Sequence, residues 1–129
     1  MIKKDTRVAV LGAGAMGCLF GGLLAEKGLE VVLIDVWKEH VDEINKKGLK
    51  MMGHGGDRII KIKATTEPKK LGKYDAIILL GCIIKGETPH FEIISQSISD
   101  KVLETSLDKN TPIIFGVLTT NNESEAEER

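Results

Sequence analysis

Apolar residues follow two alternating patterns along the 129-residue chain. Short continuous apolar runs are typical of strands buried on both faces of a parallel sheet. Between these runs, apolar residues recur every three or four positions, which predicts amphipathic helices. The predicted strands cover 7–11, 30–34, 75–81 and 112–118, and the predicted helices about 15–27, 37–47 and 89–107. Because strands and helices alternate, we predict an α/β fold with three layers around a doubly wound parallel sheet.

The segment between the second helix and the third long apolar run is less regular. Residues 49–52 predict a short strand, the glycines around His54 a turn, and residues 59–64 a strand with every second position apolar. Residues 65–73 are polar and predict a loop or a single turn. Taking 59–64 as the third strand, we expect the strand order 3-2-1-4-5. The topological switch point then lies between the strands that end at Leu11 and near Leu80.

The last helix has a clear predicted start. Thr88 is expected at its N-cap and Pro89 at its first helical position. The side chains expected to face the sheet are Phe91, Ile94, Ile98 and Val102. The polar tail, 121–129, is expected to be a frayed helix or disordered.

A glycine-rich turn joins the first strand to the first helix. Gly12 permits a sharp turn, Gly14 lets a pyrophosphate approach the backbone, and Gly17 lets the helix pack close to the strand. The helix N-terminus supplies free N–H donors for an anion. Asp35 directly follows the next predicted strand, where it either contacts a ribose hydroxyl or caps the second helix. The candidate cofactor-binding residues are Gly12, Ala13, Gly14, Ala15, Met16, Gly17 and Asp35.

Composition narrows the possible partners. The formal net charge of -1 gives no reason to expect nucleic acid or an anionic membrane. No apolar run reaches the roughly 20 residues of a membrane span, and the start Met-Ile-Lys-Lys-Asp does not read as a secretion signal. Cys18 and Cys82 lack metal-ligand spacing, so we expect reduced thiols, no metal and a cytoplasmic protein of one domain, residues 1–129.

The first part of the chain carries a family resemblance. It contains Val-Ala-Val-Leu-Gly-Ala-Gly-Ala-Met-Gly at 8–17, Ile-Asp-Val-Trp-Lys-Glu-His-Val at 34–41, Lys-Gly-Leu at 47–49, Ala-Thr-Thr at 64–66 and Tyr-Asp at 74–75. With these motifs, residues 1–80 resemble the N-terminal Rossmann domain of ketopantoate reductases (2-dehydropantoate 2-reductases). The resemblance implies a dinucleotide at the glycine turn. The family usually prefers NADP, whereas Asp35 favours NAD, so both cofactors stay open.

The resemblance to the reductases is incomplete. The family's catalytic lysine and a substrate-binding acid belong to a C-terminal helical domain that we do not find in this sequence. Cys82 stands where the family usually has a lysine, and Thr119-Thr120 where it has Asn-Gly. We therefore expect no hydride transfer.

The second part of the chain resembles another family. The motifs are Gly-Cys-Ile-Ile-Lys-Gly-Glu-Thr-Pro-His-Phe-Glu at 81–92, Pro-Ile-Ile-Phe-Gly-Val-Leu-Thr-Thr at 112–120, and the final Glu-Arg. With them, residues 81–129 are similar to the C-terminal part of lumazine synthases, pentameric enzymes with a flavodoxin-like sheet. The resemblance implies phosphate binding by Gly86, Glu87, Thr88 and Arg129, and proton transfer by His90.

We expect little of this second chemistry to operate. The family's N-terminal half, which supplies the pyrimidine pocket, has no counterpart in this sequence, and Glu123 and Glu127 replace residues that are usually apolar. His90 is then an inherited helix residue, and the protein is expected to be a monomer or weak dimer rather than a pentamer. The helices starting near Ala15 and at Pro89 are expected to point their N-termini into one crevice.

Taken together, the two resemblances indicate an engineered chimera with a Rossmann-like and flavodoxin-like hybrid sheet. Two functions stay open: a module that binds NADP or NAD without turnover, and a folding scaffold without a ligand. Residual reductase or lumazine synthase activity is the weaker alternative.

Overall fold

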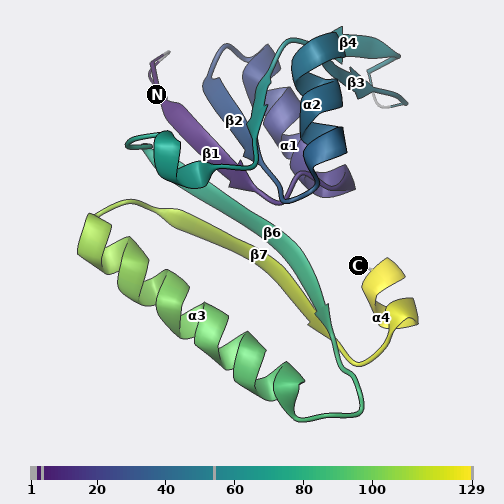
Figure 1. The fold of residues 1–129 in the computed structure, drawn as a ribbon, viewed down its shortest axis with the longest axis vertical. Helices are drawn as coiled ribbons and strands as arrows, with labels where there is room; N and C mark the ends of the chain where they lie inside the picture. The colour runs from purple at the N-terminus through teal and green to yellow at the C-terminus, as the bar shows by residue number, and fades with distance from the viewer. Residues whose placement is uncertain (1–2, 4, 54, 129) are drawn as a thin grey trace.

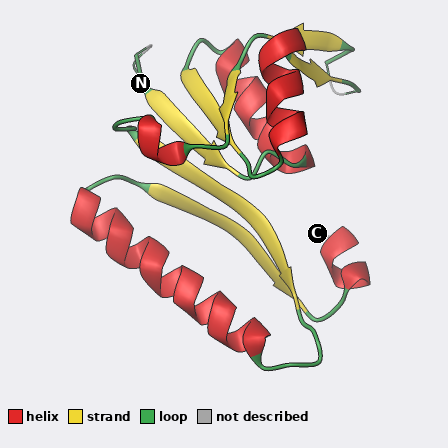
Figure 2. Ribbon diagram, viewed as in Figure 1, coloured by secondary structure: helices red, strands yellow, loops and turns green. Residues whose placement is uncertain are grey.

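The structure is a computed structural model that describes residues 3, 5–53 and 55–128, and His54 and Arg129 lie outside this part (Figure 1). Helices and strands alternate along most of the chain (Figure 2). The strands are β1 (Arg7–Leu11), β2 (Glu30–Ile34), β3 (Leu49–Met51), β4 (Arg58–Ile60), β5 (Lys63–Thr65), β6 (Ala76–Ile84) and β7 (Ile113–Thr120). The helices are α1 (Ala15–Glu26), α2 (Lys38–Lys47), the short 3-10 helix η1 (Pro68–Lys70), α3 (His90–Lys109) and α4 (Glu123–Glu127).

Five parallel strands form the main sheet, in the order β5-β2-β1-β6-β7. Because β3 and β4 form a separate two-stranded sheet, β5, β6 and β7 are the third, fourth and fifth strands of the main sheet, and its order is the predicted 3-2-1-4-5. Val8 and Val10 of β1 share a buried cluster with Val41 of α2 and half-buried side chains of α1, so α1 and α2 cover one face. Helix α3 lies on the other face, beside β6 and β7 (Figure 1). The three-layer α/β fold is therefore confirmed.

The prediction of one strand over 59–64 was wrong. Residues Arg58–Ile60 pair antiparallel with β3, and Lys63–Thr65 pair parallel with β2. The bend between them lets both Ile60 and Ile62 join the cluster beneath α1 and α2. The Asn45 side chain then fixes β5, because it donates to the Ala64 carbonyl and accepts from the Ala64 N–H, each at 2.9 Å. The alternation of apolar and polar residues over 59–64 correctly indicates which side chains are buried. It does not indicate that the first residues pair with β3 and the last with β2.

The β6–α3–β7 unit extends farther than the sequence predicts. The pairing of β6 with β1 ends at Leu79, whereas its pairing with β7 continues as far as Ile84. The two strands therefore continue past the rest of the sheet as a ribbon (Figure 1). An unbroken apolar run in the sequence indicates the minimum length of a strand. Where the strand ends depends on how far its partner strand, here β7, continues to pair with it.

Helix α3 differs in two details from the prediction. Its N-cap is Pro89 rather than Thr88, which makes His90 the first helical residue. Ile94, expected to face the sheet, is 43% exposed, while Phe91, Ile98 and Val102 are half-buried. Helix α3 packs mainly against β6 and β7, so apolar residues on its flanks, such as Ile94, stay exposed to solvent.

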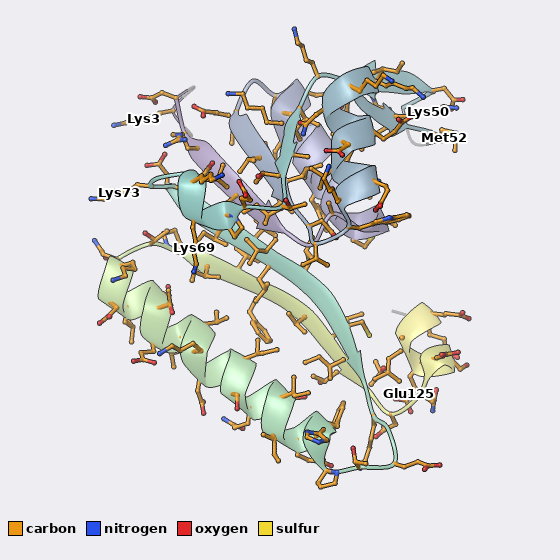
Figure 3. The ribbon with its side chains drawn as sticks, in the orientation of Figure 1. Lys3, Lys50, Met52, Lys69, Lys73 and Glu125 are labelled. Atoms are coloured by element: carbon orange, nitrogen blue, oxygen red, sulfur yellow. The ribbon has the colours of Figure 1, made fainter. Side chains whose placement is uncertain are left out.

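The tail forms a short helix rather than a disordered end. Asn122 caps α4 by accepting a hydrogen bond of 2.9 Å from the Glu125 N–H. Glu125 in turn accepts a bond of 2.8 Å from the Asn121 N–H. Charged side chains such as Lys3, Lys50 and Lys73 lie on the outside of the molecule (Figure 3). Within the described ranges, no helix is both long enough and apolar enough to cross a membrane.

Candidate functional site

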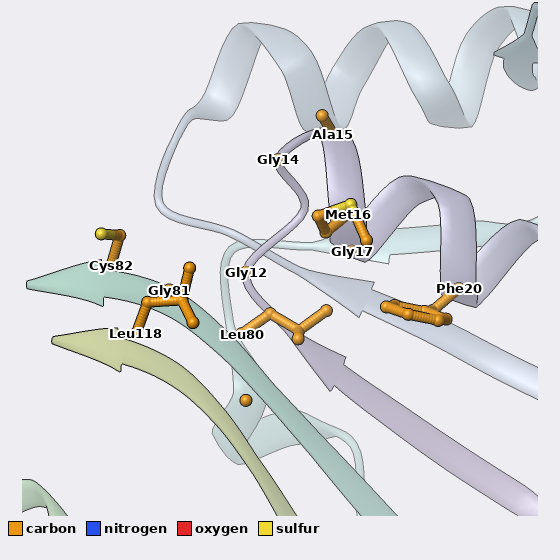
Figure 4. A pocket seen from close by; sticks show the side chains of 11 residues that line it. Gly12, Gly14, Ala15, Met16, Gly17, Phe20, Leu80, Gly81, Cys82 and Leu118 are labelled. Atoms are coloured by element: carbon orange, nitrogen blue, oxygen red, sulfur yellow. The ribbon is translucent and has the colours of Figure 1, made fainter. Parts of the chain in front are cut away.

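A cleft of about 430 Å³ lies at the carboxyl end of β1, beside residues 80–82 of β6. One wall is the glycine turn and the start of α1, and the other is the stretch of β6 that outruns β1 (Figure 4). Met16 and Phe20 of α1 face Leu80 and Cys82 of β6 across it. A cleft forms between β1 and β6, as expected for the predicted switch point, although β6 ends at Ile84 rather than near Leu80.

Two of the three glycines in the turn are required by the backbone. Gly12 has a φ of +95°, and a Cβ there would collide with the Leu80 carbonyl oxygen. Its N–H donates to the Ile34 carbonyl at 2.9 Å, which ties the turn to β2. A Cβ on Gly17 would collide with the Gly12 carbonyl oxygen. These two residues let α1 start directly above the sheet.

Gly14 differs from its neighbours. Its φ is -72°, a value open to any residue, and no atom lies within 4 Å of the position a Cβ would take. It is the N-cap of α1, and among the described residues no side chain caps that helix end. The first-turn amides therefore remain available beside open space in the cleft, an arrangement that suits an anion.

Asp35 is held by two backbone amides. Its Oδ1 accepts from the Trp37 N–H at 3.0 Å, and its Oδ2 accepts from the Ala13 N–H at 2.8 Å. The Trp37 amide, followed by that of Ala13, lowers the pKa of the Asp35 carboxyl, so this side chain is ionised at neutral pH. Asp35 is not the cap of α2 that the sequence left open as one of its two roles, because the N-cap of that helix is Trp37 and no side chain caps it; the carboxylate binds the N–H of Trp37 instead. Its contact with a ribose stays a prediction.

Two further side chains meet at Ala13, and sequence reasoning missed both. The Ala13 carbonyl oxygen lies 2.9 Å from His40 Nε2 and 3.1 Å from Cys18 Sγ. His40 also stacks on Trp37, with ring centroids 5.3 Å apart. Burial, with a smaller effect of the Asp35 carboxylate, raises the pKa of the Cys18 thiol and keeps it protonated as a donor. The available signal was that Cys18 lies in the first turn of α1, beside the cleft, and His40 in the first turn of α2.

The lumazine-synthase-like loop does not contribute to this cleft. Gly86, Glu87 and Thr88 are exposed, as is His90. Lys85 pairs with Glu92 at 3.4 Å. This loop follows the far end of the β6–β7 ribbon, away from the glycine turn (Figure 1). The expectation that the N-termini of α1 and α3 share one crevice was therefore wrong, because β6 runs on to Ile84.

The remaining sequence predictions concern Arg129 and metal ions. Arg129, a predicted phosphate ligand, lies outside the described residues. In the described ranges, no three acidic, histidine or cysteine side chains are grouped so as to hold a metal ion.

Comparison with known families matches the two halves separately. The ketopantoate reductase PanE/ApbA family matches residues 8–81, and the 6,7-dimethyl-8-ribityllumazine synthase family matches residues 58–129. Each match covers more than half of the 129 residues. The chain belongs to both families. Their shared segment, 58–81, contains β4, β5 and the first part of β6.

Solved structures similar to the chain are Rossmann-fold dehydrogenases. A D-mandelate dehydrogenase with NADH and anilino(oxo)acetate is 28% identical, with a TM-score of 0.63 over 94% of this chain and 36% of that one. A PanE/ApbA family ketopantoate reductase from Ralstonia eutropha JMP134 is 29% identical, with a TM-score of 0.55 over 74% of this chain and 30% of that one. A 2-dehydropantoate 2-reductase from Methylococcus capsulatus is 22% identical, with a TM-score of 0.58 over 95% of this chain and 36% of that one. At this identity the likeness supports the fold alone. The chain thus spans about a third of the length of these structures.

Proposed function

We propose that the protein binds a nicotinamide adenine dinucleotide, or its adenosine diphosphate part, at the glycine turn and does not transfer hydride. The observation that carries the proposal is the open space at Gly14 beside the uncapped N-terminus of α1. A pyrophosphate placed there accepts hydrogen bonds from first-turn amides and faces the positive end of the helix dipole. The similarity to a D-mandelate dehydrogenase solved with NADH supports the same ligand class.

We infer a preference for NADH over NADPH. Asp35 is ionised and directly follows β2, the place from which an acid reaches the adenosine ribose in Rossmann domains. Its charge repels a 2′-phosphate. Lys38, the first cation after it, forms an ion pair with Asp42. The reductase family's usual preference is therefore reversed in this proposal.

The absence of turnover is inferred from the residues around the cleft. Cys82 occupies the wall where the reductase resemblance places a lysine, and its thiol is a weak hydrogen-bond donor. The residues after it belong to the second family, so we propose that the chain is an engineered joining of two α/β segments whose strands and helices alternate alike. Residual activity of either parent has no comparable support from the geometry.

A single substitution tests the binding site. Gly14→Ala adds a methyl group to open space at an ordinary φ, so we expect an unchanged melting temperature. The same methyl group occupies the approach of the pyrophosphate, and we expect at least a tenfold weaker Kd for NADH. Isothermal titration with NADH, NADPH and ADP measures this on both proteins.

The control is Gly86→Ala, which also adds a methyl group to open space but lies on the far loop. It should bind NADH as the unmodified protein does. Equal affinity of the Gly14→Ala variant contradicts the proposed site, and no binding by the unmodified protein at millimolar ligand leaves the scaffold function.

A further inference from the structure

The structure assigns His40, assisted by Cys18, as a positioning residue that aims the amide of Gly14 into the cleft. This inference rests on the proposed function and identifies what prepares the site for a phosphate. It starts from the peptide group between Ala13 and Gly14, the only part of the turn whose carbonyl meets two side-chain donors among the described residues.

The donor and acceptor roles in this contact follow from chemistry. A carbonyl oxygen only accepts hydrogen bonds, so the His40 nitrogen 2.9 Å away must be the protonated Nε2. Cys18 Sγ, 3.1 Å from the same oxygen, is the second donor. Ala13 is 2% exposed, which keeps water from replacing either one. The carbonyl is therefore fixed in direction by α1 and α2 together.

Fixing this carbonyl also fixes the next amide. In a trans peptide group the C=O and the following N–H point in opposite directions. The Ala13 carbonyl points toward His40 of α2, whereas the cleft lies on the β6 side of the turn (Figure 4). The Gly14 N–H therefore points away from α2 and toward the cleft. Asp35 adds a third restraint, because it accepts from the Ala13 N–H.

The consequence for binding is preorganisation. A glycine-rich turn has many backbone conformations, and a ligand that must order it loses affinity. With His40 in place, the turn is already ordered when the phosphate arrives. His40→Leu keeps the side-chain bulk but removes the donor, and we expect roughly fivefold weaker ADP binding, the usual effect of one neutral hydrogen bond. His40→Gln returns an N–H donor at the same distance along the side chain and should restore most of the affinity.

A second position on α2 supplies the matched control. The Asn45 side chain of α2 also forms hydrogen bonds to backbone groups, but these belong to Ala64 in β5 and not to the glycine turn. Asn45→Leu should lower the melting temperature about as much as His40→Leu and leave the ADP affinity unchanged. Equal losses of affinity in both variants would mean that His40 acts only through general stability.

Two measurements keep this inference separate from the proposed function. Nitrogen-15 NMR of the ligand-free protein should show His40 protonated at Nε2, and amide exchange at Ala13 should be faster in His40→Leu but not in Asn45→Leu. If the unmodified protein binds no ADP, the proposed function fails while these measurements still decide the positioning role. A His40 protonated only at Nδ1, or unchanged Ala13 exchange, overturns the assignment.

Discussion

The two halves of the sheet are equally regular in their backbone but not in their packing. Among the described residues, all fifteen buried apolar side chains lie between Val8 and Ala64. The β6–α3–β7 unit pairs its two strands over eight residues, yet the 20-residue α3 buries no side chain fully. Leu103 and Leu107 of α3 are 63% and 74% exposed. The β6–α3–β7 unit thus has regular strand pairing without close side-chain packing.

The difference has a physical reason. Parallel strands pair through backbone groups that every sequence carries, so a strand from one family aligns with a strand from another. Close packing depends on the shapes of particular side chains on both surfaces. Within the first half, both surfaces lie in the segment that the reductase family matches, as where Val41 and Ile44 of α2 meet β1 and β2. Helix α3 lies beyond the segment that the reductase family matches and packs on β6, which begins within that segment.

The largest expected effect compares one leucine from each half. Leu33 of β2 is fully buried, and Leu33→Ala should lower the free energy of unfolding by about 3 kcal/mol, through lost burial and the cavity left behind. Leu107→Ala should change it by less than about 0.5 kcal/mol, because the side chain is already in solvent. Urea denaturation of both variants measures the two values. Similar losses would show that α3 packs as tightly as the first half.

A smaller effect separates the two cysteines. Cys18 is half-buried and its pKa is raised by burial, while Cys82 on the ribbon is exposed. We expect a disulfide reagent at pH 8 to modify Cys82 at least tenfold faster than Cys18, since the thiolate is the reacting form. Cys18→Ser and Cys82→Ser variants assign the two phases. Fast labelling of Cys18 would show that the first half opens as readily as the ribbon.

The smallest effect concerns charge. Backbone amides lower the pKa of Asp35, whereas the exposed Lys101 lowers that of Glu104. A carboxyl with a lowered folded pKa stabilises above its unfolded pKa, about 3.9 for Asp, and that stabilisation is lost as the pH falls through the folded value. Asp35→Asn should therefore be destabilised at pH 7, and the gap to the unmodified protein should close in acid.

Salt distinguishes the two carboxylates. In 1 M NaCl, Glu104→Gln should be as stable as the unmodified protein, because an exposed ion pair is screened. Asp35→Asn should still be less stable at pH 7, since short bonds to amides persist in salt. Midpoints of urea unfolding at low and high salt measure both. If salt also removes the Asp35 effect, the carboxylate acts as a surface charge and not as a link between the turn and α2.

Most of the fold was predictable because it depends on local patterns. The apolar runs and the spacing of Leu19, Leu23 and Leu24 determine a strand–turn–helix whatever surrounds them, and α1 ends before Gly28, as predicted. The resemblances to the two families also follow from sequence motifs alone. The errors arose where a partner decides the outcome, as in the split of 59–64 and the extension of β6 to Ile84.

The candidate site shows the same division. The sequence by itself determined the glycine turn, since only glycine takes the φ of Gly12 easily and only a missing Cβ fits at Gly17. It also determined that Asp35 follows β2. Tertiary structure decided that His40 and Cys18 meet the Ala13 carbonyl, because these residues lie on different helices whose approach depends on packing. It also decided that the second family's loop ends far from the turn, because strand pairing extends the ribbon beyond the sheet.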